Sequence, residues 1–303
     1  MERFESIHLP TIKVGTAERY KIDIRYRIFP FFKFRRLDQI TALQIHEFRR
    51  QLQAGTLAKK SINHATDVLR LMLNKAVKWG YVDRNPYDLD RLKVEAKEYP
   101  WWEDPGDISK ALEAAANTRY YALFRTALET GMRLGELVGL SKADVSFERG
   151  QMRVHRQWLD KQKCYGSCKG NNIRTIPMHA GLASVLKTAI ENSPHPEAVF
   201  VTRTGRRVMA RKMAGETFEL VKLRAKVPDI VFHGLRHTFA SHYMLNGGIV
   251  WDLMQILGHA DVKMTQRYAH LSPRYLNAGV VDWSRSESLT DHSPNRTLKI
   301  VSS

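Results

Sequence analysis

The sequence has 303 residues, with 48 lysines and arginines against 31 acidic residues, which gives a formal net charge of +17. This length accommodates two domains with separate cores, and the charge favours a polyanion such as nucleic acid as the partner. No run reaches the roughly 18 apolar residues of a membrane span, and the N-terminus lacks the apolar region of a signal peptide. We therefore expect a cytoplasmic protein with no membrane partner. Two cysteines, Cys164 and Cys168, are too few for a disulfide framework.

The first hundred residues have the spacing of helices. One helix is predicted between Thr41, a candidate N-cap, and Gly55, with an apolar stripe of Leu43, Ile45, Phe48 and Leu52. A longer helix is predicted from near Ser61 to Gly80. Basic residues accompany both helices and form either a solvated face or contacts to a DNA backbone; they are Arg49, Arg50, Lys59, Lys60, Arg70, Lys75 and Lys78.

A charged stretch at 91–98, followed by Pro100, has the composition of an interdomain linker. We therefore divide the chain into a helical domain at 1–98, a second domain at 99–283 and a serine-rich tail at 284–303 that we expect to be disordered. A last helix, from Tyr275 to Trp283, is predicted to dock either on its own domain or on a neighbouring protomer.

The second domain alternates between helical and strand patterns. Helices are predicted at 109–116 and 120–129, and Gly131 suits a left-handed cap that would hold Arg133 in a rigid turn. Strands are predicted at 145–147, 152–157 and 173–176, forming a small antiparallel sheet. Further helices are predicted at 181–190 and 216–225 and after His233. The expected fold class is mainly α with a small antiparallel β-sheet, in two domains.

The C-terminal third contains the residues with the clearest chemical meaning. His233-Gly-Leu-Arg236-His237 is followed by Leu257-Gly-His259 and by Thr265-Gln-Arg-Tyr268. Guanidinium groups bind phosphate oxygens in pairs, imidazoles transfer protons near neutral pH, and a tyrosine hydroxyl can attack phosphorus. Together with Arg133, this set suits phosphodiester chemistry through a tyrosine and needs no metal or other cofactor.

Four motifs in this order and spacing resemble the tyrosine recombinases, the phage-integrase family: Gly131-Met-Arg133-Leu-Gly-Glu136, the His233 motif, the His259 motif and the Tyr268 motif. The resemblance covers about residues 105–283 of the chain. The helical N-terminal region is similar to the SAM-like core-binding domain of this family.

The resemblance implies a role for each matching residue. Arg133 and Arg236 would bind the scissile phosphate, and Tyr268 would be the nucleophile that forms a 3′-phosphotyrosyl bond. Lys169 matches the hairpin lysine that protonates the 5′ leaving oxygen. His233 would accept the tyrosine proton, and His259 would contact the phosphate.

Three more residues are assigned to supporting positions. Glu136 would orient its neighbours, and we expect His237 to be a structural histidine beside the active site. Arg174, close to the hairpin lysine, is added to the DNA-binding residues.

Two metal hypotheses compete with these assignments. His233 and His237 are four residues apart, as helical metal ligands are, but the glutamate of a His-Glu-x-x-His site is missing. Cys164 and Cys168 form half of a zinc site that His155 or His179 would complete. We expect reduced, incidental cysteines and no metal.

The expected function is therefore site-specific recombination of duplex DNA through a Holliday junction, for the integration or excision of a phage or mobile element. The resemblance implies a homotetramer on paired sites and accessory DNA-bending or directionality proteins as further partners. A resolvase or invertase, a type IB topoisomerase and a basic regulator that does not cut DNA are the alternatives. Little sequence precedes the core-binding region, so a separate arm-binding domain is either absent or missing from the chain.

Overall fold

The protein is described by a computed structural model that covers residues 1–95, 99–116, 118–168 and 173–273. It divides into two compact units, Met1–Lys97 and Glu98–Ser303, each with its own hydrophobic core. The predicted helix at Tyr275–Trp283, the tail at 284–303 and Lys169 lie outside the described residues. Within those ranges, no helix combines the length and the apolarity needed to span a bilayer.

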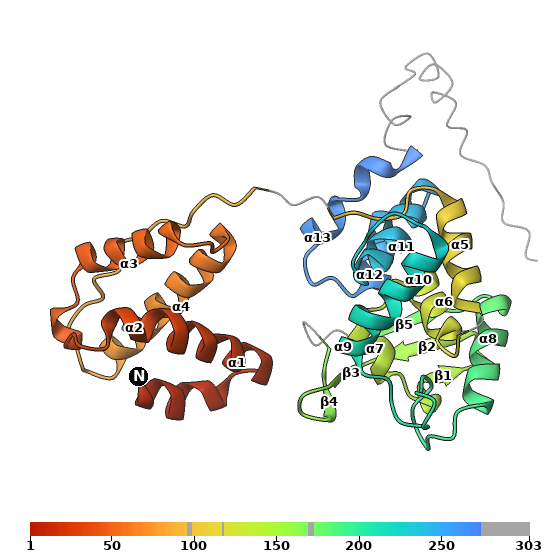
Figure 1. The fold of residues 1–303 in the computed structure, drawn as a ribbon, viewed down its shortest axis with the longest axis horizontal. Helices are drawn as coiled ribbons and strands as arrows, with labels where there is room; N and C mark the ends of the chain where they lie inside the picture. The colour runs from red at the N-terminus through yellow and green to blue at the C-terminus, as the bar shows by residue number, and fades with distance from the viewer. Residues whose placement is uncertain (96–98, 117, 169–172, 274–303) are drawn as a thin grey trace, which may run out of the picture. The chain divides into compact units, whose positions relative to one another are not determined.

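The first unit is helical (Figure 1). The sequence predicted no helix bounds for its N-terminal half. This half contains π-helical segments at Phe4–His8 and Ile24–Ile28, a short 3₁₀ turn at Leu9–Thr11, and the helices α1 (Val14–Asp23) and α2 (Phe29–Phe32). After a turn at Leu37–Gln39 come α3 (Ala42–Ala54) and α4 (Lys59–Lys78).

The predicted ends of α3 agree with the structure. The Thr41 hydroxyl accepts a hydrogen bond from the backbone N–H of Gln44, whose side chain in turn accepts one from the N–H of Thr41, and Gly55 follows the last helical residue. One part of the predicted apolar stripe is wrong: Ile45, Phe48 and Leu52 are buried, but Leu43 is 69% exposed.

The second unit begins with α5 (Pro105–Ala116), α6 (Tyr121–Thr130) and α7 (Leu134–Gly139). A three-stranded antiparallel sheet follows, in the order β1 (Val145–Ser146), β2 (Gln151–Val154) and β5 (Arg174–Pro177). The strands β3 (Arg156–Leu159) and β4 (Cys164–Ser167) form a separate pair, where the sequence had predicted one strand through 152–157.

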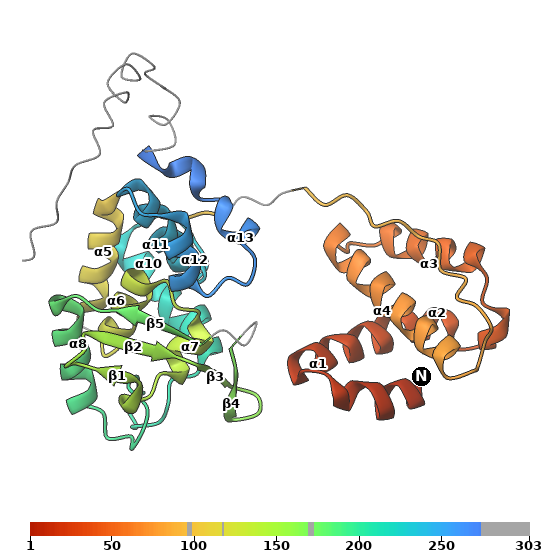
Figure 2. The same ribbon diagram turned by 180° about the vertical axis from the view of Figure 1, so that it is seen from behind.

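The remaining helices are α8 (Ala180–Glu191), α9 (Ala210–Lys212), a turn at Met213–Thr217, α10 (Phe218–Ala225), α11 (Gly234–Leu245), α12 (Val250–Leu257), α13 (Lys263–Gln266) and a short turn at Ala269–Leu271. Figures 1 and 2 show α11 against α6 and α10 against α5, and these pairs are in contact. α12 contacts the edge strand β5. α12 also contacts α11 and α13, so the motif residues in and directly after these helices lie in one region of the second unit.

Candidate active site

The carbonyl end of α12 is the centre of the site. The last carbonyl groups of a helix have no partner within the helix and form the negative end of its dipole, so they attract cations. The Leu257 carbonyl accepts hydrogen bonds from Arg236 Nη2 at 2.7 Å and from Arg133 Nη1 at 3.5 Å. The Ile256 carbonyl accepts one from Arg174 Nε at 2.6 Å. The two arginines predicted to bind phosphate are thus held on one carbonyl group.

Local backbone geometry places both arginines. Gly131 ends α6 in a left-handed conformation with φ of 60°, after which Arg133 occupies the N-cap of α7. The Gly131 carbonyl also accepts a hydrogen bond from Arg236 Nη1 at 2.8 Å. The same glycine therefore turns the chain toward Arg133 and binds Arg236. Burial, followed by the nearby charge of Arg133, lowers the pKa of Arg236 to about 9.

Glu136 connects this pair to a third arginine. It is 1% exposed and accepts hydrogen bonds from Arg133 Nη1 at 3.0 Å, Arg174 Nη1 at 3.2 Å and Arg174 Nη2 at 2.7 Å. Burial by itself would raise the pKa of Glu136, but the hydrogen bonds and charge of Arg174, with those of Arg133, lower it overall. Glu136 therefore remains a carboxylate that orients two guanidinium groups.

Arg174 needs a correction. We predicted it as a DNA-binding residue, but its side chain is 5% exposed and its guanidinium is bonded to Glu136 and to the Ile256 carbonyl. A side chain that is buried and bonded in this way has no surface to offer to a DNA backbone. Its position indicates a structural role beneath Arg133.

Tyr268 lies beside the arginines and is 6% exposed. Its hydroxyl is 2.5 Å from Nδ1 of His237. Burial raises the pKa of Tyr268 to about 12, although the charges of Arg236 and Arg267 act in the opposite direction. The tyrosine is therefore protonated at neutral pH.

The histidine that contacts Tyr268 differs from the one expected. The family resemblance predicts that His233 accepts the tyrosine proton, but the hydrogen-bond partner of Tyr268 is His237, for which we predict a structural role. His233 is exposed at the start of α11, with its ring centroid 5.2 Å from that of His237. Burial, followed by the charges of His233, Arg267 and Arg236, lowers the pKa of His237 to about 4, so it is neutral at pH 7.

His259 follows Gly258, whose φ of 64° ends α12 in a left-handed turn. His259 is 7% exposed, and its Nδ1 lies 2.7 Å from the hydroxyl of the buried Thr265. Burial, followed by the charges of Arg236 and Arg133, lowers its pKa to about 3. Thr265 was not predicted as a site residue, and its contact with His259 fixes the imidazole ring.

Two hollows open beside this cluster. One, of about 430 Å³, is lined in part by Met132, His233 and Arg236. The other, of about 360 Å³, is lined in part by Arg174, Gly258 and His259. A ligand in either hollow would contact motif residues.

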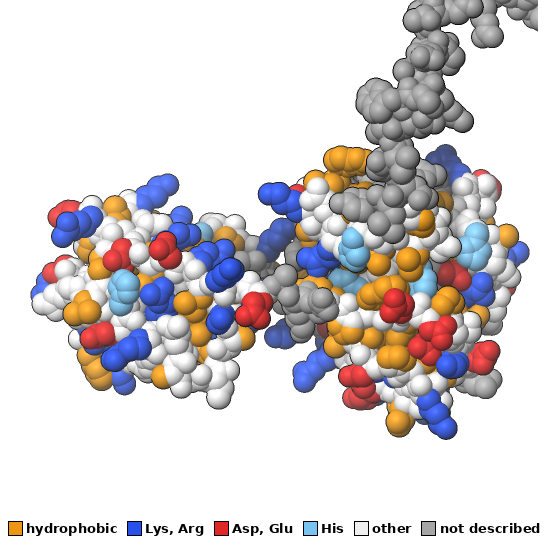
Figure 3. All heavy atoms as spheres, turned by 90° about the horizontal axis from the view of Figure 1, so that it is seen from above, with side chains coloured by type: hydrophobic (Ala, Val, Ile, Leu, Met, Phe, Trp, Pro, Cys, Tyr) orange, Lys and Arg blue, Asp and Glu red, His pale blue; other side chains and the backbone are white. Residues whose placement is uncertain are grey.

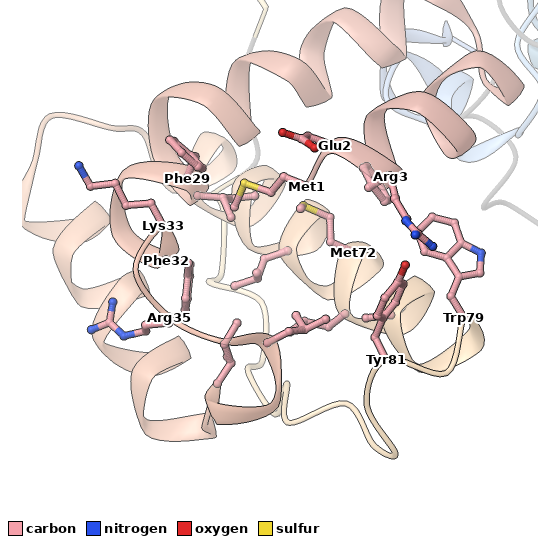
Figure 4. A pocket seen from close by; sticks show the side chains of 17 residues that line it. Met1, Glu2, Arg3, Phe29, Phe32, Lys33, Arg35, Met72, Trp79 and Tyr81 are labelled. Atoms are coloured by element: carbon pink, nitrogen blue, oxygen red, sulfur yellow. The ribbon is translucent and has the colours of Figure 1, made fainter.

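A pocket of about 510 Å³ lies in the first unit, and none of the predicted catalytic or DNA-binding residues lines it (Figure 4). Its wall is mostly aromatic and aliphatic, and the guanidinium of Arg3 lies over the ring of Tyr81 at 5.6 Å.

The predicted DNA-binding residues of the first unit differ in exposure. Arg50, Lys59, Lys60, Arg70 and Lys78 are exposed, whereas Arg49 and Lys75 are half-buried. Arg49 donates a hydrogen bond to the Asp90 carbonyl at 3.0 Å, and the Arg70 guanidinium lies 5.7 Å from the centre of the Tyr87 ring. On the face seen in Figure 3, Lys and Arg side chains spread over much of this unit.

The two metal hypotheses find no support in the geometry. His155 contacts Asp144 and His179 contacts Glu129, each at 2.9 Å. Cys164 is exposed and Cys168 is buried. Over the described ranges, no group of three or more His, Cys, Asp or Glu side chains is arranged to hold a metal ion.

Comparison with known proteins identifies the family. The model of the phage integrase family matches residues 104–274, which is more than half of the chain, and a phage integrase N-terminal SAM-like domain matches residues 1–53. The chain belongs to the phage integrase family. It is a tyrosine recombinase, an enzyme of site-specific DNA recombination.

Relatives and solved structures agree with this family. A tyrosine recombinase XerC-like protein of Caldanaerobacter subterraneus subsp. tengcongensis is 28% identical over 272 residues, which cover 78% of this chain and 68% of the relative. The Tn1549 transposon integrase in complex with transposon right end DNA has a TM-score of 0.76 at 21% identity, covering 91% of this chain and 96% of that one. A lambda integrase tetramer bound to a Holliday junction has a TM-score of 0.68 at 18% identity, covering 86% and 76%. These two structures share the fold of this tyrosine recombinase.

Proposed function

We propose that Tyr268 is the nucleophile that cuts and rejoins duplex DNA at specific sites. The observation that carries this proposal is the position of its hydroxyl on His237, beside Arg236, which shares the Leu257 carbonyl with Arg133. The tyrosine oxygen forms a bond to phosphorus while the bond from phosphorus to the 5′ oxygen breaks. Because the phosphotyrosine conserves the energy of the broken bond, a 5′ hydroxyl of another strand reseals the DNA without ATP.

Each remaining group has one task. Arg133 and Arg236 bind the oxygens on which charge builds in the transition state, and His259 contacts the same phosphate. The tyrosine proton passes to Nδ1 of His237, which replaces His233 in this role because Nδ1 of His237 lies 2.5 Å from the hydroxyl. Lys169, outside the described residues, remains our candidate for protonating the 5′ oxygen.

Duplex DNA is the proposed substrate, in the cytoplasm, with Arg50, Lys59, Lys60, Arg70 and Lys78 of the first unit as candidate backbone contacts. Arg49 and Lys75 stay in this set as less exposed members. Two duplexes present four cleavage positions, so a homotetramer is the proposed working assembly, as in the lambda integrase tetramer on a Holliday junction. DNA-bending or directionality proteins are proposed as further partners.

For the biological role we propose integration or excision of a phage or mobile element. The similarity to a XerC-like recombinase favours resolution of chromosomal or plasmid sites as the second candidate. Sequencing of DNA bound covalently in cells separates the two roles. Adducts at the ends of a mobile element support integration, and adducts at one chromosomal site replace it with resolution.

The reaction is tested with a nicked cognate half-site, recovered by selecting bound duplexes from random sequence. In EDTA, the wild-type protein should form a protein–DNA adduct that survives SDS, and Tyr268→Phe should form none. Tyr243→Phe, which changes a half-buried tyrosine on α11, is the matched control and should retain the adduct. An adduct formed by Tyr268→Phe, or one that requires a divalent metal, would contradict the mechanism.

A further inference from the structure

The segment Tyr99–Trp102, which opens the second unit, runs along α11. The backbone carbonyl of Pro100 lies close to Gly234, since a Cβ atom added to Gly234 would be 3.1 Å from the Pro100 oxygen. The backbone N–H of Trp102 donates to the Thr238 hydroxyl at 3.0 Å, and the carbonyl of Trp102 lies 2.9 Å from His242 Nε2. Successive turns of α11 therefore hold this segment in place.

The fixed segment places Tyr99 against the hydrogen-bond partner of the nucleophile. Its ring stacks on the imidazole of His237, with centroids 4.6 Å apart and planes 16° from parallel. The guanidinium of Arg267, the residue before Tyr268, lies 5.1 Å from the centre of the Tyr99 ring. Tyr99 thus contacts both the histidine that bonds the nucleophile and the neighbour of the nucleophile in the chain.

The hydrogen bonds of His237 do not by themselves fix its ring. Nδ1 is bonded to Tyr268, but Nε2 is buried and has no hydrogen-bond partner within the described part of the chain. One hydrogen bond leaves an imidazole free to rock about that contact, so packing against the ring must set its plane. Tyr99 covers the face of the ring, and His233 meets it edge-on, at 86°.

We infer that Tyr99 is a positioning residue for DNA cleavage: its ring holds the His237 imidazole in the plane in which Nδ1 meets the Tyr268 hydroxyl. This inference rests on the proposed role of Tyr268 and His237. The family motifs do not include Tyr99, and nothing in the spacing of the sequence indicates it. Its effect on the reaction passes through His237.

The stack also affects when His237 is able to accept a proton. Within the described ranges, the charged or titratable groups around it are Tyr99 from the opening segment, His233 and Arg236 from the N-cap and first turn of α11, and Arg267 and Tyr268 after α13. Burial is the main cause of its low pKa. Loss of the Tyr99 ring admits water to one face, so the pKa of His237 should rise toward its ordinary value of 6.5.

The test compares Tyr99→Ala and Tyr99→Phe with the wild type in the full chain, with saturating protein on the nicked half-site. Single-turnover rates of adduct formation are measured from about pH 3.5 to 9, a range that includes the wild-type acid limb expected near the His237 pKa of about 4. Tyr99→Ala should cleave roughly 10- to 100-fold more slowly at neutral pH, and the acid limb of its pH–rate profile should move to higher pH. Tyr99→Phe keeps the stacked ring and should restore both the rate and the limb.

Trp101→Ala is the matched control. Trp101 makes an aromatic contact from the same segment to His242 of the same helix, with centroids 5.4 Å apart, but on a different turn from His237. The Trp101→Ala variant should have its acid limb at the same pH as the wild type. Circular dichroism should show that every variant is folded at each pH used.

Four outcomes would overturn the inference. They are an acid limb that does not move in Tyr99→Ala, a rate equal to that of Trp101→Ala, faster cleavage by Tyr99→Ala, and a Tyr99→Phe variant no better than Tyr99→Ala. Failure of the proposed function looks different, because the wild-type protein would then form no adduct, or Tyr268→Phe would form one.

Discussion

The hydroxyl of Tyr268 lies 2.5 Å from Nδ1 of His237. The pKa of Tyr268 is raised to about 12 and that of His237 is lowered to about 4, in both cases mainly by burial. Because these values lie far apart, the proton stays on the tyrosine until attack on phosphorus begins. A neutral histidine in hydrogen-bond contact is then the group able to receive it as the new bond forms.

Replacing each of the two motif histidines, His233 and His237, by glutamine in separate variants should distinguish their roles in cleavage. His237→Gln should lower the single-turnover rate of adduct formation by roughly 10²- to 10⁴-fold, since it removes the proton acceptor. It should also abolish the acid limb of the pH–rate profile. His233→Gln should retain that limb, because His233 is exposed and is not the group bonded to Tyr268. A His233→Gln variant that loses the limb while His237→Gln keeps it would return the role to His233.

The buried histidines also predict how the stability of the catalytic unit depends on pH. Unfolded histidine takes up a proton near pH 6.5, whereas His237 and His259 do so only near pH 4 and pH 3 in the folded protein. Between these values the unfolded chain binds more protons, so the free energy of unfolding falls as the pH falls. The loss should be on the order of 2 kcal/mol per histidine by pH 5.

Urea denaturation followed by tryptophan fluorescence at pH 7 and pH 5 measures this loss. His237→Gln and His259→Gln should each show a smaller fall between the two pH values than the wild type. A variant whose stability falls in parallel with that of the wild type would show that its histidine is not responsible.

The helix ends around the site were predictable from sequence, but the pairing of its side chains was not. Gly131 marks the end of α6 because glycine adopts a left-handed conformation without strain, and this short-range rule placed Arg133 correctly after a turn. The contact between Tyr268 and His237 joins residues 31 positions apart. No helical or strand period relates such positions, so only the packing of α11 against the turn at Ala269–Leu271, which follows Tyr268, reveals the contact.

The buried position of Arg174 follows from a local rule of strand geometry. Residues two apart in a strand face the same side, and the apolar Ile176 of β5 is 2% exposed. Arg174 therefore faces inward with it, as the alternating burial of the strand shows. The large positive charge of the chain favours a DNA contact instead, because an average over the whole composition cannot identify which arginines have a buried carboxylate partner.

The pairing of Arg174 with Glu136 should be essential to the fold of the catalytic unit. Glu136→Gln leaves the guanidinium of Arg174 buried without an opposite charge, and such a loss costs about 3–5 kcal/mol. Glu129→Gln is the matched control, since Glu129 pairs with Arg125 at 2.8 Å but both side chains are 24% exposed. Its cost should stay below about 1 kcal/mol.

Urea denaturation curves of the two variants give these values, and a double variant gives a further check. Adding Arg174→Met to Glu136→Gln removes the uncompensated charge and should recover part of the lost stability. If Glu136→Gln and Glu129→Gln lower the free energy of unfolding equally, the buried pair stabilises the protein no more than the partly exposed pair does.

Gly131 should be the most sensitive glycine of the site, because it combines a positive φ with a crowded position. A Cβ there would lie 2.5 Å from Cδ1 of Phe239 and 2.8 Å from Cδ2 of Leu257, so the neighbouring side chains must move. Gly131→Ala should therefore lower the free energy of unfolding by two contributions. The left-handed backbone conformation contributes about 1–2 kcal/mol, and overpacking of the added methyl group contributes roughly 1–3 kcal/mol.

Gly247→Ala isolates the first of these two costs. Gly247 has φ of 79°, and a Cβ there would meet nothing within 4 Å. The free energy of unfolding of the Gly247→Ala variant should fall by only about 1–2 kcal/mol, and its rate of adduct formation should equal that of the wild type. Gly131→Ala should also cleave more slowly at a temperature where it is folded, because the Gly131 carbonyl and Leu257 both hold Arg236. If the two variants lose the same stability and cleave at the same rate, crowding at Gly131 does not control the position of Arg236.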